Sequence, residues 1–111
     1  MQASPALETV TVLRPAGELS LTEADSLLRV LTDLLLENRK QVVVNLKRVT
    51  HVSLGAIPKL AEKNRRFRSL GGEIKLVGVA PYVANLFNLV GALSYFDVTS
   101  DEEEAVARFE R

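Results

Sequence analysis

Gln41-Val42-Val43-Val44-Asn45-Leu46 is the segment of this 111-residue chain with the clearest structural signature. It is a nearly continuous apolar run of the length of one β-strand. Strands of this type are buried on both faces, as in parallel sheets that are covered by helices. The segment therefore predicts the central strand of an α/β fold.

The sequence before this strand predicts a further strand and a long helix. Thr9–Arg14 alternates β-branched residues with others, as strands do, and Pro15-Ala16-Gly17 then predicts a turn. Glu18-Leu19 can form a short strand that pairs back. A capping-box-like start at Thr22, followed by leucines spaced three and four apart, predicts a helix from about Thr22 to about Asn38.

The sequence after the central strand predicts a second helix that begins near Ser53 to Gly55 and ends at Gly71-Gly72. Pro58 favours a start at Leu54 or Gly55, because proline is tolerated in the first turn of a helix but not further in. The other expected elements are a strand at Glu73–Val79, a helix from Pro81 to Val90, a short strand at Phe96–Val98, and a helix at Asp101–Phe109 capped by Ser100. This order predicts an α/β layer fold with parallel strands joined by right-handed helical crossovers.

Composition and charge exclude several classes of function. Lys and Arg total 14, and Asp and Glu total 14, so no net charge draws the chain to nucleic acid or to an anionic membrane. The chain has no cysteine, which excludes disulfides, thiolate metal sites and cysteine nucleophiles and fits a reducing compartment. Met1–Pro5 lacks signal-peptide features, and no stretch approaches the ~20 apolar residues of a membrane helix. We expect a cytoplasmic protein of one domain, residues 1–111, with no nucleic-acid partner and no direct membrane insertion.

No set of residues with catalytic or metal-binding chemistry stands out. His51 is the only histidine, and Ser53, two positions away, is too close along an extended chain for a base–nucleophile pair. Asp101-Glu102-Glu103-Glu104 opens a helix, where negative charge offsets the partial positive charge of the helix N-terminus. Gly71-Gly72 and Gly78 do not match a phosphate-binding loop. We therefore expect no enzymatic activity, no metal and no cofactor.

The second predicted helix is strongly basic. Its cations are Lys59, Lys63, Arg65, Arg66 and Arg68. Glu62 is the only acidic residue between Leu60 and Leu70. A solvated helix face is the ordinary explanation for this pattern. An electrostatic landing surface for an acidic partner protein is the alternative.

Three groups of segments carry a family likeness. They are Gly17-Glu18-Leu19-Ser20, then Val42–Leu46 with Val49–Ala56, and then Gly71–Val79 with Pro81-Tyr82-Val83 and Leu86–Gly91. In this order and spacing they resemble STAS domains, the family of bacterial anti-sigma factor antagonists and their relatives. The likeness extends from about Val10 to about Ala107. It implies an α/β, STAS-like fold with a mixed, mostly parallel sheet of four to five strands and about four helices.

The resemblance implies a partner-binding surface around the start of the second helix. Antagonists of this type carry an Asp-Ser-Ser/Thr-Gly motif there, in which the serine after the aspartate is phosphorylated by an anti-sigma factor that is also a kinase. The charge and bulk of the phosphate disrupt docking. Ser53, Leu54, Gly55 and Ala56 take the four motif positions here, so the usual phosphoacceptor is missing.

Two further positions that are often acidic in the family are neutral in this chain, Ser20 and Asn45. The partner-binding surface implied by the resemblance consists of Ser20, Asn45, Thr50, His51, Ser53, Leu54, Gly55, Ala56, Lys59 and Lys63. We expect Ser53 to lie in the loop or to bond the helix entrance, because serine is common there. A shifted phosphosite at Ser53 is the less favoured alternative.

The function implied by the resemblance is regulatory binding of an anti-sigma factor or a related ATPase or kinase-type protein, without phosphorylation of the usual serine. Two alternatives are an accessory subunit of a membrane transport ATPase complex and a non-phosphorylated scaffold of a signalling assembly. The small apolar patch at Leu54, Gly55 and Ala56 also favours self-association into a homo-oligomer.

Overall fold

A five-stranded sheet is the central layer of the computed structural model, which describes residues 2–7 and 10–109. The strands in spatial order are β1 (Gln2–Leu7), β2 (Val10–Arg14), β4 (Gln41–Asn45), β6 (Glu73–Val77) and β7 (Val98–Thr99). β1 pairs with β2 in antiparallel fashion, and the other neighbours are parallel. β4 is the predicted central strand, and its three valines are fully buried. The predicted mixed, mostly parallel sheet is confirmed.

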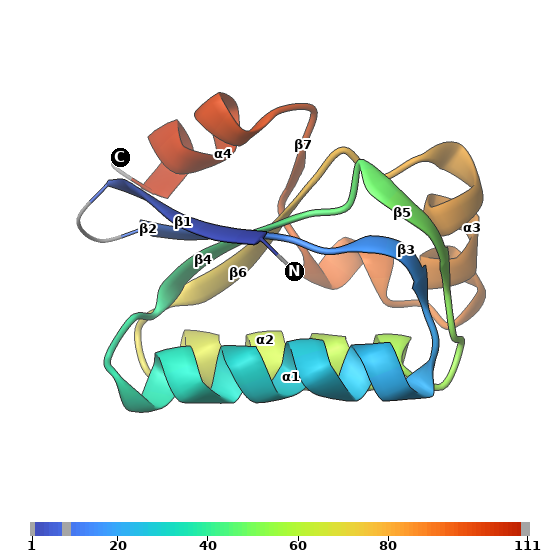
Figure 1. Cartoon of the computed structure of the whole chain (residues 1–111), viewed down its shortest axis with the longest axis horizontal. Helices are drawn as coiled ribbons and strands as arrows, with labels where there is room; N and C mark the ends of the chain where they lie inside the picture. The colour runs from blue at the N-terminus through green and yellow to red at the C-terminus, as the bar shows by residue number, and fades with distance from the viewer. Residues whose placement is uncertain (1, 8–9, 110–111) are drawn as a thin grey trace.

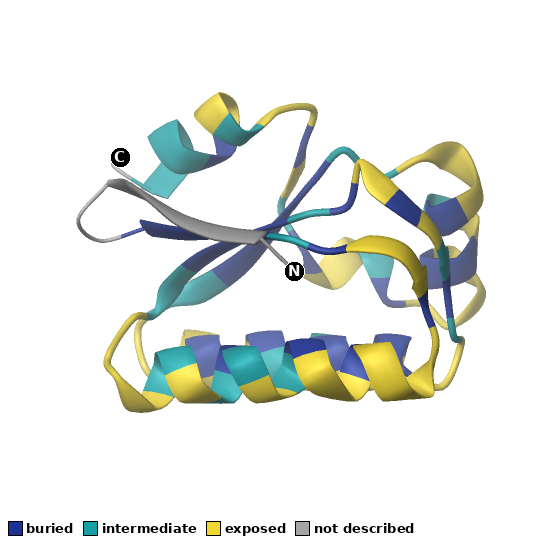
Figure 2. Ribbon diagram, in the orientation of Figure 1, coloured by how far each residue is buried: buried dark blue, intermediate teal, exposed yellow. Residues whose placement is uncertain are grey.

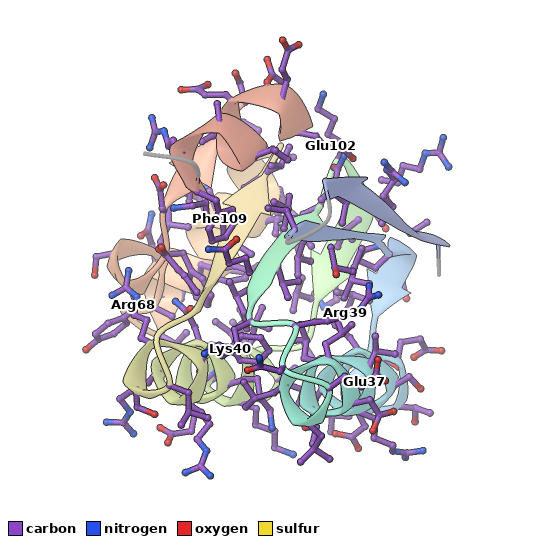
Figure 3. All side chains as sticks on the ribbon, turned by 90° about the vertical axis from the view of Figure 1, so that its left-hand side faces the viewer. Glu37, Arg39, Lys40, Arg68, Glu102 and Phe109 are labelled. Atoms are coloured by element: carbon purple, nitrogen blue, oxygen red, sulfur yellow. The ribbon has the colours of Figure 1, made fainter. Side chains whose placement is uncertain are left out.

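Helices cover both faces of this sheet (Figure 1). Within the described residues they are α1 (Leu21–Leu36), α2 (Ile57–Ser69), α3 (Pro81–Leu89) and α4 (Glu102–Phe109), with a short 3-10 helix, η1, at Leu93–Tyr95. α1 and α2 lie side by side under one face, and α4 lies on the other (Figures 1 and 3). No helix in the described part of the chain combines the length and the apolar character needed to span a bilayer.

The two faces of the sheet carry two hydrophobic clusters of unequal size. The larger cluster joins the sheet to α1, α2 and α3, and Phe67 and Phe87 are its largest fully buried side chains. The smaller cluster lies under α4, where Ala105 and Phe109 meet the buried valines of β2 and β4. Figure 2 shows the largely buried strands β2, β4 and β6 between helices whose outward faces are exposed. That residues 1–111 form a single domain stays a prediction.

A second, two-stranded sheet departs from the prediction. It pairs β3 (Ala16–Leu19) with β5 (Arg48–Val52) in parallel, so Glu18-Leu19 does not pair back onto the preceding strand. Only the buried Pro15 separates β2 from β3, and one residue is too short for a hairpin turn. β5, which the sequence analysis did not identify as a strand, buries Val49 and Val52, exposes Arg48 and Thr50, and leaves His51 half-buried, so its burial does not follow the simple alternation that reveals a strand in a sequence.

The start of α2 is later than predicted. The helix begins at Ile57 rather than at Leu54 or Gly55, with Pro58 in its first turn as expected. A turn closed by the Ala56 N–H donating to the Ser53 carbonyl, at 2.9 Å, occupies the residues between β5 and α2. Ser53 therefore does not cap α2.

The caps of two other helices also differ from the predicted ones. Ser20, not Thr22, is the N-cap of α1, and its hydroxyl donates to the Glu23 carboxylate. Asp101, not Ser100, caps α4, because its carboxylate accepts the Glu104 N–H at 2.8 Å. Each correction is a shift of one or two residues, which is the usual scatter of cap assignment.

Candidate partner-binding site

The turn between β5 and α2 is the centre of the candidate site. The Ser53 N–H donates to the Leu19 carbonyl of β3 at 2.9 Å, which fixes the start of the turn to the small sheet. At the next position the Leu54 side chain is 44% exposed, and Gly55 is exposed as well. The backbone is therefore anchored while an apolar side chain faces solvent.

The start of α1 lies directly beside this turn, at the lower right of Figure 1. A methyl group at Gly55 would lie 3.6 Å from Cδ2 of Leu21 and 4.0 Å from Oγ of Ser53. Leu21 is 52% exposed, and Ser20 next to it is exposed. We call these five residues, Ser20, Leu21, Ser53, Leu54 and Gly55, the turn surface.

Leu21 is the member of the turn surface that the sequence analysis missed. The helix was expected to begin at Thr22, which left Leu21 in the connection. The signal that could have placed it is the pair Ser20 and Glu23, which has the spacing of a capping box and moves the helix start to Leu21. Leu21 then occupies the first helical position, before the buried residues of α1 begin, and its apolar side chain faces solvent.

Ala56, which was predicted to belong to the partner surface, is not accessible. Its side chain is 3% exposed and belongs to the larger hydrophobic cluster together with the neighbouring Ile57. Because the turn reverses at Ala56 to enter α2, this side chain faces inward. The Ala56 side chain is therefore not part of the turn surface.

Thr50 and His51 lie on β5, before the turn. Thr50 is exposed, whereas His51 is half-buried and stacks on Tyr82 of α3 with ring centroids 5.9 Å apart. His51 Nδ1 and the Tyr82 hydroxyl form a hydrogen bond of 3.0 Å. Within the described residues the Ser53 hydroxyl forms no hydrogen bond with His51 or any other group. The geometry therefore gives His51 a contact with α3 and not a role as a base for Ser53.

Asn45 lies away from the turn surface. It ends β4 and is thus near the opposite end of β5 from Ser53 (Figure 1). Its amide nitrogen donates to Glu102 of α4 at 2.6 Å, and its amide oxygen accepts the Lys47 N–H at 2.9 Å. The Arg14 guanidinium donates to the same carboxylate at 2.7 and 2.9 Å. Asn45 thus helps to hold α4 on the sheet.

The Arg14–Glu102 contact predicts a pH-dependent contribution to stability. Hydrogen bonds from Arg14, reinforced by Asn45, lower the pKa of Glu102 below its ordinary value of 4.5, although partial burial opposes the shift. A lowered folded-state pKa stabilises the fold above about pH 4.5, and this contribution is lost as the pH falls through the folded-state pKa. We expect Glu102→Gln to reduce the free energy of unfolding at pH 7 by about 1 kcal/mol, less than is typical of a charged hydrogen bond because the pair is partly exposed to solvent.

Urea denaturation at pH 7 and at pH 3 checks this prediction. The difference between the wild type and Glu102→Gln should shrink at the lower pH, because protonation of Glu102 removes the charge that Arg14 pairs with. Glu103→Gln is the matched control, because Glu103 is exposed on the same turn of α4. A deficit of equal size at both pH values would contradict the assignment.

Lys59 and Lys63 lie along α2, on the side that faces α1. Lys59 Nζ is 4.0 Å from the Asp25 carboxylate, and Lys63 Nζ donates to the Thr32 hydroxyl at 2.8 Å. Both partners belong to α1. These two lysines therefore border a groove between the helices and are not part of the turn surface. Over the described ranges no cluster of three or more acidic or histidine side chains could hold a metal ion.

Comparison with known proteins agrees with this architecture. The model of the STAS domain family matches residues 3–105. BtrV of Bordetella bronchiseptica, whose name describes it as a candidate anti-sigma factor antagonist, is 29% identical over 73 residues, or 66% of this chain. That match spans 63% of the length of BtrV.

Several solved structures share the fold. The unphosphorylated anti-sigma factor antagonist SpoIIAA has a TM-score of 0.82 at 19% identity, covering 98% of this chain and 95% of SpoIIAA. An anti-sigma factor antagonist from Mycobacterium paratuberculosis has a TM-score of 0.83 at 16% identity, covering 99% and 92%. The murine anion transporter Slc26a9 has a TM-score of 0.79 at 17% identity, covering 94% of this chain and 18% of the transporter.

Proposed function

The chain belongs to the STAS domain family, and we propose that it binds an anti-sigma factor or a related kinase-type ATPase in the cytoplasm through the turn surface. The family match confirms that the chain resembles anti-sigma factor antagonists. In the proposed mode, binding does not depend on phosphorylation at the usual serine position. The partner and the mode of binding are the proposed parts.

The observation that carries the proposal is the exposure of Leu54 on a backbone that is held in place. The turn is tied to β3 at one end and closed on itself at the other, so binding costs little ordering of the chain. Leu54 and Leu21 lie next to Gly55 and present apolar area to solvent. Adjacent exposed apolar side chains of this kind are typical of surfaces that bind another protein.

The proposed absence of the phosphorylation switch follows from the side chains available at the turn. Leu54 has no hydroxyl that could accept phosphate. Ser53 is half-buried and its backbone N–H and carbonyl are both engaged, which limits access of a kinase to its hydroxyl. A phosphate on Ser53 would also lie beside Leu21 and Gly55, within the apolar contact area.

We expect no stoichiometric phosphate on this chain after incubation with its cognate kinase, ATP and magnesium. Intact-mass spectrometry measures this directly, and Ser53→Ala should give the same result as the wild type. A full phosphate on Ser53 that is absent from Ser53→Ala would overturn the proposed lack of a switch, while leaving the binding surface in place.

The class of partner is tested by co-purification with matched baits. The full chain should retain a protein whose sequence identifies it as a histidine-kinase-type ATPase or anti-sigma factor, and Leu54→Asp should lose it. Recovery of transporter subunits alone would support the accessory-subunit alternative and reject the proposal. Recovery of other STAS proteins without an ATPase would support the scaffold alternative and also reject it.

A further inference from the structure

The groove between α1 and α2 is a second surface feature, separate from the turn surface. It encloses about 540 Å³ and is lined by Leu28, Pro58, Lys59, Glu62, Lys63 and Arg66. The two helices run side by side along one side of the molecule (Figure 1), and Figure 3 shows them end-on with outward-pointing side chains. Four of the six lining residues, Pro58, Lys59, Glu62 and Arg66, are exposed, so the groove is open to solvent.

The floor of the groove is apolar. Leu28 of α1 is half-buried and packs against the main core, and Pro58 of α2 is exposed. The hydrocarbon stems of the lysine and arginine side chains add to this apolar surface while their charged ends remain in water. A ligand that fits here must therefore offer apolar side chains as well as charge.

The cations around the floor lack strong counter-charges. Among the residues that the structure describes, the half-buried Lys63 bonds only to the Thr32 hydroxyl, which itself donates to the Leu28 carbonyl at 3.0 Å. Arg66 makes no ion pair with any residue that the structure describes. Two ammonium N–H groups of Lys63 and the guanidinium of Arg66 are thus available to an anion.

The two acidic residues nearest the groove do not neutralise it. Asp25 pairs with Lys59 only at 4.0 Å, and both side chains are more than half exposed, so this ion pair is weak. The Glu62 carboxylate pairs with Arg65, on the side of α2 away from α1. The groove therefore combines an apolar floor with net positive charge.

We propose that this groove binds an acidic amphipathic segment of a partner protein in the form of a helix. Large apolar residues of that helix contact the floor of the groove, and its carboxylates pair with Lys63 and Arg66. Helix-in-groove recognition uses this combination of apolar anchors and flanking charges. A nucleic acid or an anionic bilayer would also extend over α1, where Asp25 at the edge of the groove and Asp33 on the exposed face would repel its phosphates. A narrow cationic stripe next to an acidic helix fits a single peptide segment better than it fits a nucleic acid or a bilayer.

A synthetic peptide of leucine and glutamate at helical spacing is a suitable probe. Titrated into the isotopically labelled full chain, it should produce saturable amide NMR shifts that cluster on Leu28, Lys63 and Arg66. The same composition in scrambled order, and a leucine–lysine peptide of the same spacing, should bind at least about ten-fold more weakly, because they lose the apolar face or reverse the charge. Equal binding of either control peptide, or shifts that map elsewhere, would overturn the proposal.

Charge-reversal variants give a second readout. Arg66→Glu and Lys63→Glu should each weaken the peptide by about ten-fold in fluorescence anisotropy. Arg48→Glu is the matched control, because it makes the same change of charge at an exposed residue of β5. An equal loss of affinity in Arg48→Glu would show that net charge alone causes the effect, and it would overturn the proposal that the peptide binds in the groove. Leu54→Asp should bind the peptide normally, so failure at the turn surface and failure at the groove are distinguishable.

Discussion

Leu54→Asp should weaken binding of the anti-sigma-type partner by at least about 100-fold, which corresponds to about 3 kcal/mol. The side chain is 44% exposed in the free protein, so the aspartate is well solvated before binding and costs the free fold little. In the complex the same carboxylate would be buried without a counter-charge, since Ser20, Leu21, Ser53 and Gly55 around it are uncharged. Leaving one charge buried and unpaired typically costs several kcal/mol. Isothermal titration calorimetry with the purified partner measures the change.

Leu36→Asp is the matched control for that experiment. Leu36 is 81% exposed at the end of α1, the far end of that helix from Leu21 (Figure 1), so the same chemical change there lies outside the turn surface. The affinity of Leu36→Asp for the partner should equal that of the wild type, and circular dichroism should show that both variants are folded. Unchanged affinity in Leu54→Asp, or an equal loss in Leu36→Asp, would place the binding surface elsewhere. Sedimentation of both variants also tests whether Leu54 supports a homo-oligomer.

Elements whose signals are local could be predicted from the sequence. The buried run that became β4 carries its own evidence of burial, and the glycine at position 71, with φ of 88°, ends α2 where a left-handed residue was expected. Pro81 likewise opens α3 at its first position. In each case the physical cause lies within a few residues of its effect.

Features that depend on distant partners could not be predicted in this way. In the described part of the chain β3 and β5 pair only with each other, although α1 and β4 separate them in sequence, and neither strand is long or apolar enough to be recognised alone. The contact of Asn45 could not be predicted for the same reason, because its hydrogen-bond partner, Glu102, is 57 positions away. A resemblance can place Asn45 on the central strand, but only the tertiary structure places it against α4.

Asn64 is a buried polar residue on the inward face of α2, and Asn64→Leu should lower the free energy of unfolding by about 2–4 kcal/mol. Its side chain is 1% exposed. The side-chain oxygen accepts the Ile74 N–H of β6 at 2.8 Å, and the side-chain nitrogen donates to the Tyr95 carbonyl of η1 at 3.0 Å. Urea denaturation of the wild type and the variant measures the loss.

The size of this effect follows from the short length of β7. β7 pairs only with Leu76 and Val77 among the described residues, so no strand lies beside Ile74 on that side of β6 and its N–H depends on Asn64 for an acceptor. Leucine would gain apolar burial of up to about 2 kcal/mol, but it would leave two backbone groups unsatisfied at about 1–3 kcal/mol each. Asn64→Asp, which keeps an acceptor for Ile74, should retain more stability at a pH where the carboxyl is protonated than at neutral pH. If Asn64→Leu were as stable as the wild type, water or a backbone shift would have to replace both hydrogen bonds, and Asn64 would not be what joins α2 to β6 and η1.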